Sequence, residues 1–247
     1  MLIPGELAAS LRRAQAVTVL TGAGISAESG VPTFRDAQTG LWARYRPEEL
    51  ATPEAFQRNP KMVWEWYLHR RETLGRAEPN AGHFALADIE RRVPSFTLVT
   101  QNVDGLHAKA GSRNLIELHG NIVRTKCFGA GHPIDRLPDD ARVPPHCPLC
   151  GSRLRPDVVW FGEMLPEGAM ERATEAAIAC DVFLCVGTSA LVYPAAELPA
   201  IAKHGGALVI EVNPDPSPVA DFADFTLAAA AGIALPALVN AAWPGNG

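Results

Sequence analysis

The sequence predicts an α/β fold in which a parallel sheet carries helices on both faces. Short apolar runs rich in β-branched residues, which are typical of buried strands, alternate along the chain with amphipathic stretches. These runs are residues 17–20, 97–99, 182–186, 207–212 and 224–227. The Ala-rich segment 227–238 predicts a turn followed by a helix against the edge of the sheet.

Composition restricts the kind of protein. The chain has 247 residues, of which 47% are hydrophobic and 20% charged, as in an ordinary globular protein with one sizeable core. The net charge of −5 gives no electrostatic footprint for nucleic acid, so we expect no specific nucleic-acid partner. Five cysteines are an odd count, which argues against a disulfide framework, and Cys180 and Cys185 are expected to be buried, unreactive thiols.

No membrane or export segment is expected. The chain begins without the basic and then apolar layout of a secretory signal. Its longest apolar stretch, 182–196, is interrupted by Gly187, Thr188 and Ser189 and is too short to cross a bilayer. We therefore expect a cytoplasmic protein.

A glycine-rich turn follows the first predicted strand, in the order Thr21-Gly22-Ala23-Gly24-Ile25-Ser26. A strand, a Gly-x-Gly turn and a helix usually begin a dinucleotide site, because the glycines let the backbone approach the pyrophosphate. The following residues 28–32 (Glu-Ser-Gly-Val-Pro) end any helix early and open a loop that contains Phe34 and Arg35. A hydride-transferring dehydrogenase would continue this helix for several turns, so the early end disfavours that class.

Two further motifs follow the same order along the chain. Residues 100–107 (Thr-Gln-Asn-Val-Asp-Gly-Leu-His) come after an apolar run, and Glu117-Leu118-His119-Gly120 comes a dozen residues later. With Gly187-Thr188-Ser189 and Val212-Asn213 downstream, the chain resembles the sirtuin family of NAD-consuming protein deacylases from about residue 16 to residue 236. The resemblance implies a Rossmann-like NAD-binding domain with a small inserted domain.

The expected domain boundaries follow from two insertions. Residues 41–76 are helical in pattern and rich in Trp, Tyr and Arg, and residues 127–155 are rich in Pro, Gly and Cys. We expect the large NAD-binding domain to comprise about 1–40, 77–123 and 156–247. The small domain would then consist of a helical part, about 41–76, which holds the acyl pocket, and a Cys-rich, zinc-ribbon-like part, about 124–155.

The resemblance also implies the reaction. The acyl-lysine oxygen attacks C1′ of the nicotinamide ribose, which releases nicotinamide and forms an alkylimidate. His119 then acts as general base on the ribose hydroxyls, a role that suits a side chain with an ordinary pKa near 6.5. Water completes the reaction to give free lysine and 2′-O-acyl-ADP-ribose. Asn102 would orient the ribose and a water, Asp104 would hold the nicotinamide carboxamide, and Gln101 would contact the ribose.

The same resemblance places the remaining NAD contacts. A first group should line the pyrophosphate and begin the following helix: Gly22, Ala23, Gly24, Ser26 and Ala27. Phe34 and Arg35 belong to the cofactor loop, where an aromatic ring can shield the oxocarbenium-like centre from water. A second group should serve the phosphates, the adenosine ribose and the adenine: Gly187, Thr188, Ser189, Asn213 and Ala231.

Two segments are expected to bind the acyl-lysine protein or peptide in extended form. Residues 158–163 fit a segment that pairs in β fashion with the substrate, through Val158, Val159, Phe161 and Gly162. Tyr67 and Arg70 are three residues apart and share a helix face, where a phenol and a guanidinium can bind a carboxylate. Ala51 leaves room for a longer acyl chain. This pattern resembles the class III subgroup, which removes succinyl, malonyl or glutaryl groups.

The Cys-rich segment departs from the family pattern of two Cys-x-x-Cys pairs. Cys147 and Cys150 form one such pair. The other pair would begin at Cys127, but the position that would complete it holds Ala130. His132, or less favourably His146, could supply the fourth ligand of a structural zinc ion. Weak binding by three ligands, and no metal at all, remain open.

Other functions also remain open at this stage. A general deacetylase, a mono-ADP-ribosyltransferase and a catalytically silent NAD-binding interaction module share much of this pattern. The joint presence of His119, Asn102 and Asp104 argues against the silent module, which has no need of all three. The oligomeric state is left open.

Overall fold

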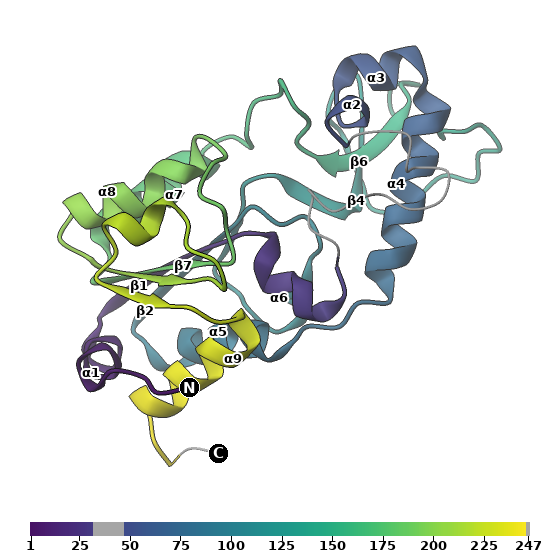
Figure 1. Cartoon of the computed structure of the whole chain (residues 1–247). Helices are drawn as coiled ribbons and strands as arrows, with labels where there is room; N and C mark the ends of the chain where they lie inside the picture. Colours follow the sequence, from purple (N-terminus) through teal and green to yellow (C-terminus); the bar gives the residue numbers. More distant parts are fainter. Residues whose placement is uncertain (32–46, 246–247) are drawn as a thin grey trace.

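A six-stranded parallel sheet forms the centre of the larger part of the protein (Figure 1). The computed structural model describes residues 1–31 and 47–245. The strands lie in the order β3-β2-β1-β7-β8-β9. Their bounds are β1 Ala16–Thr21, β2 Ser95–Thr100, β3 Leu115–Glu117, β7 Val182–Val186, β8 Leu208–Val212 and β9 Phe225–Leu227. The predicted α/β fold is confirmed, and the predicted apolar runs coincide with every strand of this sheet except β3.

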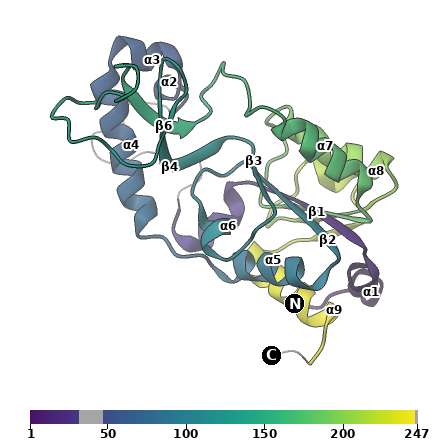
Figure 2. The ribbon, with the colours of Figure 1, turned by 180° about the vertical axis from the view of Figure 1, so that it is seen from behind.

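Helices cover both faces of the sheet, as Figures 1 and 2 show from opposite sides. One face packs against α1 (Gly5–Arg13), α5 (Ala81–Arg92) and α9 (Ala231–Ala242), and the other against α7 (Ala169–Ala179) and α8 (Leu198–His204). Successive residues of a strand point to opposite faces, so that Leu184 enters the first core and Cys185 the second. Because both faces are buried, the strands read as continuous apolar runs rather than as alternating ones.

A smaller unit lies at one end of the large sheet (Figures 1 and 2). It contains an antiparallel sheet of β5 (Pro133–Ile134), β4 (Gly120–Cys127) and β6 (Leu154–Val158), in that order. The helices α2 (Pro47–Leu50), α3 (Pro53–Arg58) and α4 (Pro60–Gly75) pack on it. One core holds residues from both parts, including Phe56, Trp66, Ile122, Val158 and Trp160. A second core joins Trp64 of α4 to Cys127, Cys147 and Leu154, so residues of the two predicted insertions pack together although they are far apart in the sequence.

Local signals explain where the helices of this unit begin. The side chain of Thr52 accepts a hydrogen bond from the N–H of Ala55, and Asn59 caps α4 by accepting from Met62. A proline follows each cap, at Pro53 and Pro60, where its missing N–H costs nothing. The two helices are separated by one residue, Asn59, which ends α3 and caps α4.

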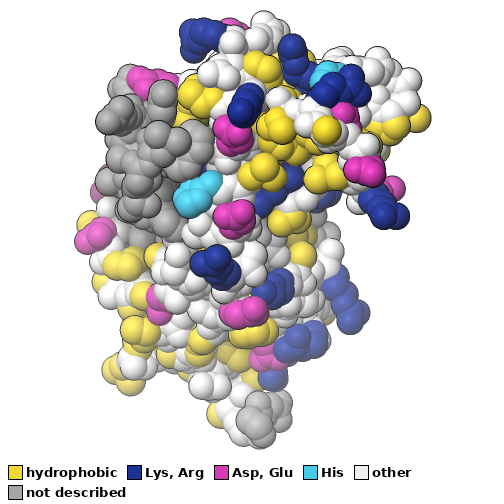
Figure 3. Space-filling view, turned by 90° about the vertical axis from the view of Figure 1, so that its right-hand side faces the viewer, with side chains coloured by type: hydrophobic (Ala, Val, Ile, Leu, Met, Phe, Trp, Pro, Cys, Tyr) yellow, Lys and Arg dark blue, Asp and Glu magenta, His cyan; other side chains and the backbone are white. Residues whose placement is uncertain are grey.

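Short helical segments connect these elements. They are the four-residue helix α6 (Leu106–Lys109) and the 3₁₀ segments η1 (Ala23–Ser29), η3 (Ala195–Glu197) and η4 (Pro218–Asp221). Within the described parts of the chain, no helix is both long enough and apolar enough to span a membrane. Basic and acidic side chains are interspersed on the face drawn in Figure 3, and hydrophobic side chains gather in its upper part.

Candidate active site

The candidate site lies at the carboxyl ends of four neighbouring strands. The chain leaves β1 for β2 on one side of the sheet, whereas β7 and β8 lie on the other side. In parallel sheets, ligands bind where the strand order reverses in this way. The loops after β1, β2, β7 and β8 contain most of the residues that the sequence singles out.

Three glycines bring the loops after β1 and β7 into close contact. A Cβ atom on Gly22 would lie 2.8 Å from the Cα of Thr188, and one on Gly24 would lie 2.7 Å from the carbonyl oxygen of Gly187. Gly187 itself has φ +57°, which favours glycine. The N–H groups of Gly22 and Gly24 donate to the carbonyls of Val186 and Gly187. These glycines are therefore required for loop packing, and their own N–H groups are already engaged within the protein.

The segment after the glycine turn ends early, as predicted. Residues Ala23–Ser29 form a 3₁₀ helix that stops at Gly30, whose φ of +74° is left-handed. Ser26 and Ala27 lie within this segment rather than at its first turn. Phe34 and Arg35 lie outside the described residues.

A buried polar cluster joins the loops after β1 and β2. The Ser26 hydroxyl donates to Oδ2 of Asp104 at 2.7 Å, and the backbone N–H of Leu106 donates to Oδ1 at 2.9 Å. Asn102 donates through Nδ2 to the Gly22 carbonyl at 3.0 Å and to the Ser26 hydroxyl at 3.3 Å. Burial raises the pKa of Asp104. The structure thus brings Ser26 together with Asn102 and Asp104, from which it is separated by 76 and 78 positions.

Two buried histidines, His83 and His107, lie next to this cluster and were not among the site residues expected from the sequence. Nδ1 of His83 accepts from the backbone N–H of Asn80, so the neutral ring carries its proton on Nε2, which faces the Ser26 hydroxyl at 3.4 Å. Burial lowers the pKa of His83 to about 4 and that of His107 to about 3. The capping box Asn80-Ala81-Gly82-His83, at the start of α5, was the signal that could have identified His83.

The position and tautomer of His119 are set by its neighbours. Its Nδ1 lies 2.9 Å from the carbonyl oxygen of Gln101, which can only accept, so Nδ1 holds the proton and Nε2 keeps its lone pair. Burial lowers the pKa of the ring, opposed by this hydrogen bond. The following Gly120 has φ +76° and lies tightly against the backbone of Asp157. His119 is therefore a neutral base with a fixed orientation.

The other predicted NAD contacts meet at Thr188. Gln101 donates to its hydroxyl at 3.0 Å, and Asn213 donates to its carbonyl oxygen at 3.1 Å. Ser189 follows directly in the same loop, so the loops after β2, β7 and β8 converge there. Ala231 lies apart from this point, buried at the first residue of α9 and against Gly82 of α5.

The predicted substrate segment runs between His119 and Ala51. The N–H of Val159 donates to the His119 carbonyl at 2.9 Å, and that of Phe161 donates to the Ala51 carbonyl at 3.0 Å. Val158 is buried in the small core, Phe161 is half exposed, and Gly162 has φ +84°. A substrate strand would therefore use groups of this segment other than these two N–H groups.

Tyr67 and Arg70 lie on the inner side of α4. The Tyr67 hydroxyl accepts from the indole Nε1–H of Trp160 at 2.9 Å, and the Arg70 guanidinium lies 5.1 Å from the centre of the Trp66 ring. Burial raises the pKa of Tyr67 to about 12 and lowers that of Arg70. Among the described residues, Nε of Arg70 has no hydrogen-bond partner although it is buried. A buried cation with an unsatisfied donor favours an anionic ligand.

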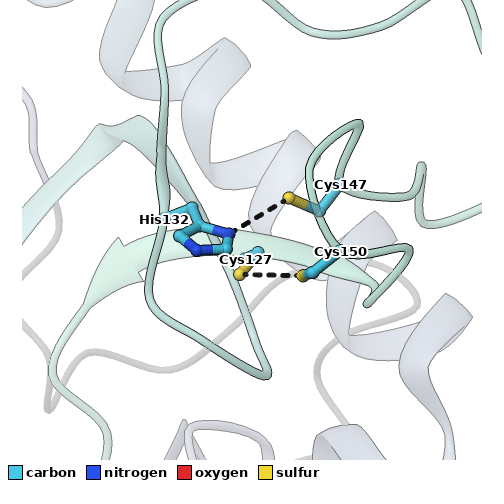
Figure 4. Close-up of side chains that lie close together, drawn as sticks. All are labelled: Cys127, His132, Cys147 and Cys150. Carbon is cyan, nitrogen blue, oxygen red and sulfur yellow. Dashed lines mark hydrogen bonds between the residues drawn. The ribbon is translucent and has the colours of Figure 1, made fainter.

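Three cysteines and one histidine converge between β4 and β6 (Figure 4). The ligand atoms of Cys127, His132, Cys147 and Cys150 all lie within 4.8 Å of one another. Cys150 Sγ is 3.8 Å from Cys127 Sγ, and Cys147 Sγ is 3.7 Å from His132 Nδ1. Ligands at zinc–sulfur distances of about 2.3 Å, placed tetrahedrally, are about 3.8 Å apart, so the donor set and its spacing fit zinc. His146 is turned instead toward Asp140, at 3.5 Å.

We expect the purified protein to contain about one zinc ion per chain, because three thiolates and one imidazole complete a tetrahedral site. Elemental analysis should show that zinc is lost in Cys147→Ser and reduced in His132→Ala, and that it is unchanged in His146→Ala. Cys185→Ser, a buried thiol in β7, is the matched control. A zinc content near zero in the unsubstituted protein would contradict the prediction.

Comparison with known proteins agrees with this geometry. The profile of the Sir2 family matches residues 22–194. The chain is 52% identical over 236 residues to the NAD-dependent protein deacylase of Ralstonia nicotianae, with 96% of each chain covered. It is 50% identical over 243 residues to the NAD-dependent protein deacylase of Pyrococcus furiosus, again with 96% of each covered.

Solved structures show the same fold. A complex of a Sir2 homologue with NAD superposes with a TM-score of 0.89 and 46% identity, covering 97% of this chain and 93% of the other. A Sir2 complex with a p53 peptide and NAD⁺ superposes with a TM-score of 0.81 and 31% identity, covering 92% and 93% of the two chains.

Proposed function

Since the chain belongs to the Sir2 family, we propose that it removes acyl groups from protein lysines with NAD as co-substrate, and that it favours succinyl and malonyl groups. The products are nicotinamide, 2′-O-acyl-ADP-ribose and free lysine. The observation that carries the deacylase function is His119, a half-buried neutral base whose ring is fixed by the carbonyl oxygen of Gln101, next to Asn102 of the polar cluster. The acyl preference is supported by the buried Nε of Arg70, which has no hydrogen-bond partner among the described residues.

The residues at the strand ends suit NAD. The glycines at positions 22, 24 and 187 let the loops after β1 and β7 pack closely together at the strand ends, where a dinucleotide would bind. The groups that would hold NAD are Gly22, Ala23, Gly24, Ser26, Ala27, Gln101, Gly187, Thr188, Ser189, Asn213 and Ala231. Bound NAD supplies an electrophilic ribose carbon and nicotinamide as the leaving group.

The buried cluster would recognise the nicotinamide end. Asp104 is held through Oδ2 by Ser26 and through Oδ1 by the Leu106 N–H, so its carboxyl group has a fixed orientation toward a carboxamide. Asn102 is anchored by the Gly22 carbonyl and would orient the ribose and a water. Nε2 of His83 faces the Ser26 hydroxyl and would hold it in place, which makes His83 a positioning residue in this proposal.

His119 would serve as the general base. Its protonated Nδ1 donates to Gln101, so Nε2 can take a proton from a ribose hydroxyl without a change of tautomer. Burial keeps the ring neutral at working pH by lowering its pKa. Nε2 of His119 would thus accept the proton that leaves the ribose hydroxyl.

The acyl-lysine would lie between residues 158–162 and the helical insertion. Val158, Val159, Phe161 and Gly162 would contact the extended peptide backbone, and Ala51 would leave space for the acyl chain. At the end of that chain, a terminal carboxylate would meet the Tyr67 hydroxyl and the Arg70 guanidinium. Tyr67 is buried and so is Nε of Arg70, so a charge-assisted hydrogen bond there is stronger than in water.

A mass-spectrometric assay with NAD and matched acetyl-lysine and succinyl-lysine peptides tests this function. We expect NAD-dependent loss of both groups, faster for succinyl, with release of acyl-ADP-ribose; omission of NAD is the control. Equal rates would indicate a general deacetylase. A stable ADP-ribose label on protein would indicate mono-ADP-ribosyl transfer, and no loss of either group would indicate a silent NAD-binding module.

The proposed partners are acyl-lysine proteins or peptides bound in extended form. The net charge of −5 does not favour a nucleic acid. A cytoplasmic location and the absence of a membrane partner stay predictions.

A further inference from the structure

Trp160 connects the substrate segment to the acyl pocket. Its indole Nε1–H donates to the Tyr67 hydroxyl oxygen at 2.9 Å, and the two rings stack with centres 6.3 Å apart. Trp160 and Tyr67 are 2% and 3% exposed, so water cannot replace this hydrogen bond. An indole nitrogen only donates, which makes the Tyr67 oxygen the acceptor and leaves its own proton for another partner.

The phenol remains a donor under working conditions. Burial raises the pKa of Tyr67 to about 12, and the nearby Arg70 charge opposes this only in part. Arg70 lies one turn further along α4, with its Nε unsatisfied among the described residues. Tyr67 and Arg70 therefore present two buried donors that a single carboxylate can satisfy.

Trp160 is itself held from two directions. The Arg155 guanidinium lies 3.3 Å from the centre of the indole ring, and its nitrogens make two hydrogen bonds to the Glu163 carboxylate. Glu163 also accepts from the backbone N–H of Trp160 at 2.8 Å. A cation on the face of an indole withdraws electron density and makes the ring N–H a better donor. Arg155 and Glu163 thus fix both the position and the donor strength of Trp160.

We propose that Trp160 determines acyl specificity as a positioning residue: it orients the Tyr67 hydroxyl so that its proton points to the terminal carboxylate of the acyl group. Arg155 and Glu163 hold Trp160 in place for this task. The inference rests on the proposed preference for acidic acyl groups. An acetyl group has no terminal carboxylate, so its removal does not depend on this hydrogen bond.

Trp160→Phe keeps an aromatic ring and removes the donor. We expect KM for a succinyl-lysine peptide to rise about fivefold to tenfold, as for the loss of one buried hydrogen bond, and KM for the acetyl peptide to change less than about twofold. In a Tyr67→Phe background the same change should add nothing further, because the hydroxyl that it orients is gone. A role confined to structure would raise KM for both peptides in both backgrounds, which would overturn the inference.

A second variant keeps the test decisive if Trp160→Phe does not fold. Incorporation of benzothienylalanine at position 160 replaces the indole N–H by sulfur with little change of shape. It should raise KM for the succinyl-lysine peptide as Trp160→Phe does, with little change for the acetyl peptide. Trp243→Phe is the matched control, because Arg92 also lies over that ring, at 5.4 Å, far from the site.

The outcomes separate the inference from the proposed function. If Arg70→Met and Tyr67→Phe change the ratio of succinyl to acetyl removal but neither Trp160 variant does, the inference is wrong and the acyl preference stands. If none of these variants changes the ratio, Tyr67 and Arg70 do not bind the acyl carboxylate, and the inference is wrong together with that assignment.

Discussion

Arg70→Met should reduce kcat/KM for succinyl-lysine peptides by roughly a hundredfold, which is what the loss of one or two charge-assisted hydrogen bonds costs. Arg70 is half-buried on α4, and its buried Nε has no hydrogen-bond partner within the described residues. A terminal acyl carboxylate would supply that partner. Removal of acetyl groups should change less than about threefold, since acetyl offers no charge to the pocket. Steady-state kinetics with the succinyl-lysine and acetyl-lysine peptides measure the ratio of the two kcat/KM values.

Two further variants sharpen this result. Arg70→Lys keeps the positive charge but loses the planar guanidinium with its paired N–H donors. Its kcat/KM for succinyl-lysine peptides should therefore lie between the values of the parent protein and Arg70→Met. Arg76→Met is the matched control, because this arginine is exposed at the C-cap of α4. Equal losses for both peptides in Arg70→Met would show that the residue supports the fold and does not select the acyl group.

His119→Ala should lower kcat/KM for both peptides by about two to four orders of magnitude, the usual contribution of a general base. The reason is that Nε2 alone carries a free lone pair in the tautomer set by Gln101. The loss should be the same for succinyl and acetyl substrates, because the base acts on the ribose and not on the acyl tail. His204→Ala, an exposed histidine at the end of α8, is the control.

The pH profile provides an independent reading of His119. Burial lowers its pKa below the ordinary value of 6.5, so the neutral base persists above that pH and is lost only at lower pH. The rate should therefore be flat above pH 6.5 and fall as the pH drops through the lowered pKa. An acidic limb above pH 6.5, or one that survives in His119→Ala, would show that another group is the base.

The sequence by itself determined the sheet and most of the candidate site. The strands β1, β2, β7, β8 and β9 were predictable because burial on both faces requires continuous apolar runs. β3 was not, because three residues are too few for a periodic signal. The early end of η1 was predictable because Gly30 takes the left-handed conformation that ends such a segment.

Only the tertiary structure decided which side chains work together. It shows that His132 rather than His146 lies beside the three cysteines of the metal site, since His146 is turned toward Asp140. It also added His83 to the polar cluster, and it joined Tyr67 to Trp160 across 93 positions of the chain. Such contacts have no local signature, because they depend on how α4, α5 and β6 pack against their neighbours. The sequence carries local propensity and burial pattern, whereas the pairing of distant polar groups is set by packing alone.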